Sequence, residues 1–170
     1  MTFARLTSLA DSIDRLTGAV GRAAAWLVVA VVLLEFALVV ARYLFGMGSI
    51  WLSEAAVYAH AALFLLAAAW TLSVGGHVRV DIFYADASAR TKAVIDLIGA
   101  LVLLLPFALA LLYLATPYVA RSWAIFERSQ ESSGLPLLFA LKTLIPVFAA
   151  LMALQGVVQA IRALAALRVP

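Results

Sequence analysis

The sequence predicts an all-α integral membrane protein with four transmembrane helices and a short N-terminal amphipathic helix. Three observations support this fold class. Apolar residues make up 66% of the 170-residue chain and charged residues only 12%, whereas soluble domains have about half and about a quarter. The apolar residues gather into four long spans, each close to the roughly 20 residues that a helix needs to cross a bilayer. The alternating pattern of a membrane β-barrel is missing.

Residues 1–22 predict an amphipathic helix on the membrane surface, distinct from a four-helix domain over residues 23–170. Apolar side chains recur here every three or four residues, with polar ones largely between them, so that one side of the helix is apolar. The apolar positions are Phe3, Leu6, Leu9, Ile13, Leu16 and Val20. Gly18 and Gly21 are expected to form a hinge between this helix and the first span.

The four spans are bounded by residues that are typical of helix ends and membrane interfaces. They are predicted at residues 23–45, 53–74, 94–118 and 135–160. Glycines follow the first two spans, where they are common after a helix. Tryptophans are enriched at membrane–water interfaces. The chain has four of them near predicted span ends, at Trp26, Trp51, Trp70 and Trp123.

Lysine and arginine predict the orientation, because cytoplasmic loops are enriched in them. One side of the membrane would carry Arg5, Arg15, Arg22, Arg79, Arg90, Lys92, Arg162 and Arg168. The other side would carry Arg42, Arg121 and Arg128, and Lys142 lies within the fourth span. Both termini are therefore predicted in the cytoplasm, and the basic residues are expected to meet membrane lipids and not nucleic acid.

The sequence predicts neither an enzyme nor a cofactor-binding or metal-binding protein. It has no cysteine, which excludes disulfides, thiolate metal sites and iron–sulfur clusters. Its two histidines, His60 and His77, are 17 residues apart, or about 25 Å along a helix, too far to share a metal or haem. His77 and Asp81 lack the further ligands that a metal needs. With Arg79, they are expected to mark where the chain leaves the membrane.

Glu35 is unusual because it lies near the middle of the first span, where a charged side chain costs at least about 2.5 kcal/mol. Other polar residues of the outer half are expected to form a cluster with it. This predicted cluster comprises Glu35, Arg42, Glu54, His60 and Lys142. Paired charges that fix helix order or bind a partner are the favoured interpretation. A small four-helix protein that conducts protons or ions is the alternative.

Three motifs near the span ends give the chain a family resemblance. They are ARYLFGMGSIWLSEAAVY at residues 41–58, GGHVRVDIF at 75–83 and QESSGLPLL at 130–138. In this order the sequence resembles the DctQ-like small membrane subunit of tripartite ATP-independent periplasmic (TRAP) transporters. The family pattern falls on Arg42, Trp51, Glu54, His77 and Asp81, while Ala55 stands where many members have a second acid.

The resemblance implies a function that composition does not. In the family, a periplasmic substrate-binding protein captures a small solute, often an organic acid, and a large multi-span membrane subunit moves it with a sodium gradient. The small subunit scaffolds and anchors the large one in the bacterial inner membrane. The resemblance thus implies a transport component without a catalytic site or cofactor.

Overall fold

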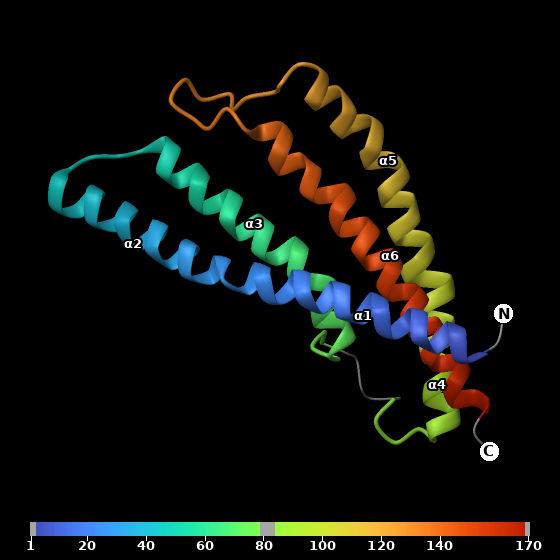
Figure 1. Cartoon of the computed structure of the whole chain (residues 1–170). Coiled ribbons are helices and arrows are strands. Elements are labelled where there is room, and N and C mark those ends of the chain that lie inside the picture. The colour runs from blue at the N-terminus through green and yellow to red at the C-terminus, as the bar shows by residue number, and fades with distance from the viewer. Residues whose placement is uncertain (1–2, 79–83, 169–170) are drawn as a thin grey trace.

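The computed structural model describes residues 3–78 and 84–168 and is helical along most of that length (Figure 1). The elements are α1 (Phe3–Ala25), α2 (Leu27–Phe45), α3 (Ile50–Ser73), α4 (Ala89–Ile98), the π-helical segment η1 (Gly99–Leu104), α5 (Leu105–Ala124) and α6 (Leu138–Arg168). No strand occurs in these two described ranges. The predicted all-α class is therefore confirmed.

Four helical stretches are long and apolar enough to cross a membrane, which confirms the predicted number of spans. They cover Ala4–Phe45, Ile50–Ser73, Ala89–Ala124 and Leu138–Arg168. All four are longer than predicted, the second by only two residues. The first has 42 residues, or about 63 Å of helix, twice the roughly 30 Å of the hydrocarbon core. Helical hydrogen bonds thus continue where the side chains become polar, so that hydropathy alone underestimates the length of these helices.

The spanning helices form an open layer in the order α2, α3, α6, α5 (Figure 1). α3 and α6 pack against each other at the centre, α2 packs on the outer side of α3, and α5 packs on the outer side of α6. Within the described residues, α2 contacts neither α5 nor α6, and α3 does not contact α5. The arrangement is therefore not a closed bundle, and no side chain of the described α2 is buried.

The predicted hinge at Gly18 and Gly21 is wrong, because α1 is a continuous helix through both residues. Both glycines are buried where α1 crosses Trp70 of α3. A Cβ atom added at Gly21 would lie 2.4 Å from the Cβ atom of Trp70, so only glycine allows this approach. The helical path is instead interrupted by a turn at Trp26, between α1 and α2.

A cluster of buried apolar residues lies where α1 meets α6, near the end of the molecule that carries both termini (Figure 1). It consists of Ala10, Ile13, Val158 and Ile161, with Leu6 packed against it. α4 packs on α6 in the same region. The N-terminal helix therefore has a protein-facing side as well as exposed leucines at Leu9 and Leu16.

Candidate functional site

Glu54 ties the first turn of α3 to the loop between α5 and α6. One carboxylate oxygen accepts a hydrogen bond from the hydroxyl group of Ser129, and the other accepts one from the backbone N–H of Leu135 at 2.6 Å. Ser49 caps the same helix by accepting a hydrogen bond from the backbone N–H of Leu52. Glu54 therefore has a structural role in holding the loop over the end of α3.

Lys142, in the first turns of α6, pairs with Glu127 in the preceding loop. Its Nζ atom lies 2.5 Å from Oε2 of Glu127 and 4.4 Å from the ring centroid of Tyr118. The hydrogen bond from Lys142 holds the pKa of the Glu127 carboxyl below its ordinary value. Lys142 is thus not the partner of Glu35, as the predicted cluster required.

The remaining members of the predicted cluster do not come together either. Glu35, Arg42 and His60 all have exposed side chains, and none forms an ion pair or hydrogen bond with a residue that the structure describes. Arg42 lines an open hollow of about 470 Å³ whose wall also includes Glu54 and Glu131. The expectation of one five-residue cluster is wrong, because its two other members, Glu54 and Lys142, are bound to the loop between α5 and α6.

Trp51 and His77 lie at the two ends of α3. Trp51, in the first turn, is half exposed, as expected of a side chain at a membrane interface. After the last turn, Gly75 takes the positive φ of a helix terminus, +71°, and its N–H donates to the carbonyl of Leu72. Nε2 of His77 lies 3.1 Å from the carbonyl oxygen of Ala68, and since a carbonyl only accepts, the ring donates there. His77 therefore folds back onto the end of α3.

Arg79 and Asp81 belong to the same GGHVRVDIF motif as His77. Both lie outside the described residues. In the described ranges, no group of three or more histidine or acidic side chains is placed to hold a metal ion.

A buried polar network between α1 and α6 had not been predicted. Gln155 is fully buried; its amide N–H donates to Asp14 at 3.0 Å, and its amide oxygen accepts from the hydroxyl group of Thr17 at 3.3 Å. Arg162 donates to Asp14 and lies 3.8 Å from Asp11. The spacing of Asp14 and Thr17, and of Gln155 and Arg162, places each pair on one helical face, but nothing local indicates that the two faces meet.

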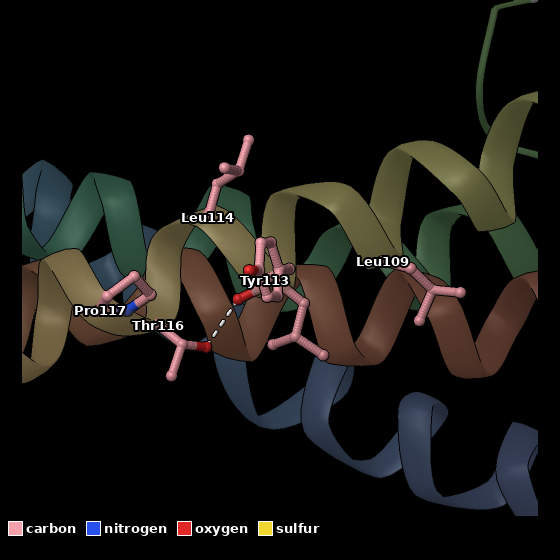
Figure 2. Close-up of a pocket in the computed structure, with 6 residues that line it drawn as sticks. Leu109, Tyr113, Leu114, Thr116 and Pro117 are labelled. Atoms are coloured by element: carbon pink, nitrogen blue, oxygen red, sulfur yellow. Dashed lines mark hydrogen bonds between the residues drawn. The ribbon is translucent and has the colours of Figure 1, made fainter.

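The outward side of α5 carries a shallow apolar hollow of about 580 Å³ (Figure 2). Leu109, Tyr113 and Pro117 are among its lining residues, and the hydroxyl group of Thr116 donates to the carbonyl of Leu112 at 2.6 Å. That bond satisfies the hydroxyl within its own helix. The hollow thus offers apolar surface and no convergent polar groups for a charged solute, which suits a lipid-facing helix.

Comparison with known proteins gives one finding. The family described as "Tripartite ATP-independent periplasmic transporters, DctQ component" matches residues 31–166, which include all of α3 to α5 and most of α2 and α6. No curated protein and no solved structure matches the chain.

Proposed function

Because the chain belongs to the DctQ family of TRAP transporter components, we propose that it is the small membrane subunit of a sodium-coupled transporter for a small organic acid. The family is one of transporter components and not of enzymes. Members belong to a tripartite transporter with a large membrane subunit and a periplasmic binding protein. In this role the chain scaffolds and anchors the large subunit and holds no solute or sodium site of its own.

The open layer of helices is the observation that supports this proposal. A spanning helix with no buried side chain, such as α2, gains little from its own chain and leaves most of its surface for lipid or for another protein. Association between helices in a bilayer depends on close packing and on polar contacts. A subunit that presents a whole helix edge is suited to binding a larger membrane partner.

The contacts of Glu54 and Lys142 with the loop between α5 and α6 support the role of a rigid scaffold. Glu54 and Lys142 each fix the loop between α5 and α6, so that this loop moves with α3 and α6 as one unit. Such a loop can present a fixed surface to the periplasmic binding protein. An ion path, the alternative function, would need polar groups aligned through the layer, and Glu35 and His60 lie exposed on the helices' outer surfaces instead.

The N-terminal helix is proposed to lie at the cytoplasmic surface of the bacterial inner membrane. One face of α1 packs on protein through Ala10 and Ile13, while Leu9 and Leu16 remain exposed beside it. These leucines would enter the lipid interface, and Arg5, Arg15 and Arg22 would meet lipid phosphates. Both termini then face the cytoplasm.

The test is reconstitution of solute uptake. The large subunit, with the periplasmic binding protein outside, is placed in liposomes with and without this chain under an inward sodium gradient. We expect uptake only when the chain is present, and loss of uptake when the sodium gradient is dissipated. Full uptake by the large subunit without this chain would show that the scaffolding role is wrong.

A further inference from the structure

The exposed surface of α2 is divided into two flanks of different chemistry. One flank, here the Glu35 flank, consists of Val28, Val32, Glu35, Val39 and Arg42, and all five side chains are exposed. Their spacing alternates between four and three residues, which is the spacing of a seam along which two helices pack. The flank combines β-branched side chains, which hold a fixed shape, with one acidic and one basic residue.

The other flank, here the Leu33 flank, is apolar. Its residues 29, 33 and 40 each follow a residue of the Glu35 flank and so lie about 100° further around the helix. It consists of Val29, Leu33, Val40 and Leu44; Val40 is half-buried, and the exposed fractions of Leu33 and Leu44 are 60% and 75%. This surface has no polar side chain that needs a hydrogen-bonding partner, so lipid tails can cover it. The two flanks lie at the same depth on one helix, so each provides a control for the other.

Glu35 has no partner among the residues that the structure describes. It forms no hydrogen bond or ion pair with any residue in the described ranges. Lys142 is bound to Glu127, and Arg42 lies seven residues away, about 10 Å further along the helix axis. An acidic side chain at mid-membrane is expected to face protein and to be paired. Since no described residue supplies the pairing group, another molecule is the source to test.

We propose that the Glu35 flank is the surface on which a transmembrane helix of the large subunit docks, with a lysine or arginine of that helix opposite Glu35. This rests on the proposed function, since it assigns the contact surface of the same complex. The seam spacing fits a helix, and the charge of Glu35 selects a basic side chain on it. The Leu33 flank then faces lipid.

Because the chain has no cysteine, single cysteines can report which flank meets the partner. Val28→Cys and Val32→Cys lie on the Glu35 flank, and Val29→Cys and Leu33→Cys are their immediate neighbours on the other flank. Each is labelled with a thiol-specific photo-crosslinker and irradiated in the membrane complex. We expect adducts with the large subunit to dominate from Val28→Cys and Val32→Cys. Equal or stronger adducts from the Leu33 flank, or only lipid adducts from the Glu35 flank, would overturn the proposal.

Substitution of Glu35 tests the charge. Glu35→Leu should reduce the large subunit that co-purifies in detergent by about tenfold or more, because it leaves the partner's cation unpaired. Glu35→Gln should retain more of the complex, since it still accepts a hydrogen bond. Glu35 is exposed in the free chain, so Glu35→Leu should unfold at the same temperature as the parent when each is purified alone. Undiminished complex with Glu35→Leu would overturn the docking assignment.

The two proposals fail in different ways. If the parent chain never co-purifies with the large subunit, the proposed function is wrong, and the docking surface with it. If the parent co-purifies and supports uptake while the Glu35 flank labels only lipid, the docking surface alone is wrong.

Discussion

Gln155 is the largest of the buried polar residues in the described structure. Its side chain is fully buried in a largely apolar protein and is satisfied by Asp14 and Thr17 of the N-terminal helix. Buried polar groups are costly when they are left without partners and modestly stabilising when they are paired. Together with the contact of Arg162 with Asp14, these hydrogen bonds make the docking of α1 on α6 specific.

Gln155→Leu should lower the free energy of unfolding by about 1–3 kcal/mol, because Asp14 and Thr17 lose a buried partner. Gln159→Leu is the matched control, one turn further along α6, at a side chain that has no hydrogen bond to the described residues. It should change the stability by no more than about 0.5 kcal/mol. Denaturant titration in detergent, followed by tryptophan fluorescence, measures both. Equal losses from the two variants would contradict a specific role for the network.

The ion pair of Glu127 and Lys142 predicts a dependence on pH. The folded pKa of Glu127 is depressed by its hydrogen bond from Lys142, so its contribution is present above the unfolded value of about 4.3. The contribution is lost as the pH falls through the lower folded pKa. Glu127→Gln should therefore be less stable than the parent at pH 7, and the difference should disappear in acid.

Thermal unfolding in detergent across the acid range measures this difference. Glu131→Gln is the control, since Glu131 is exposed in the same loop and its side chain forms no ion pair with the described residues. The unfolding temperature of Glu131→Gln should equal that of the parent at every pH. A difference between Glu127→Gln and the parent that persists in strong acid would mean that the ion pair is not its cause.

At the scale of elements, close approach between helices depends on small residues. Many of the buried apolar residues are alanines, among them Ala56, Ala69 and Ala149, and small side chains let transmembrane helices approach closely. The crossing of α1 over α3 is the tightest example, because Trp70 lies directly against Gly21.

Gly21→Ala should destabilise the protein by about 1–3 kcal/mol, the usual penalty for overpacking, since its new methyl group would overlap Trp70. Gly99→Ala is the control: no atom lies within 4 Å of a Cβ added there, and the backbone is helical. It should be neutral or slightly stabilising. The measurement is again denaturant titration, with proteolysis of α1 as a second readout. A harmless Gly21→Ala would show that α1 and α3 separate readily.

At the scale of the whole molecule, the long helices place their loops at two opposite ends. The end of α3 and the start of α4 lie toward the end that carries the termini, and the loop between α5 and α6 lies at the other end (Figure 1). Four spanning stretches return the chain to the side where it began. The basic residues then decide which end is cytoplasmic.

Ala85→Cys and Ser132→Cys should be labelled from opposite sides of the membrane. Both positions are exposed, the first before α4 and the second in the outer loop. A membrane-impermeant maleimide added to spheroplasts should label Ser132→Cys at once and Ala85→Cys only after permeabilisation. Labelling of both from the same side would contradict the topology, and the reverse pattern would contradict the orientation.

The sequence by itself determined the fold class, the number of spans and the family. These depend on local properties: an apolar run must cross the bilayer as a helix wherever it lies, because lipid cannot satisfy backbone hydrogen bonds. The motifs around Arg42, Trp51 and Glu54 add the family resemblance, which the match over residues 31–166 confirms.

Only the tertiary structure decided which side chains meet. The pairing of Glu54 with Ser129, and of Gln155 with Asp14, joins residues 75 and 141 positions apart, and no local pattern encodes such a contact. The predicted cluster is wrong for the same reason, because similar depth in the membrane does not place side chains on facing surfaces. Lys142 pairs with Glu127 and not with Glu35. The predicted hinge at Gly21 is wrong for the same reason, because only the packing of α1 on α3 shows that Trp70 lies against this glycine. Helix periodicity fixes a face, and only packing fixes what that face touches.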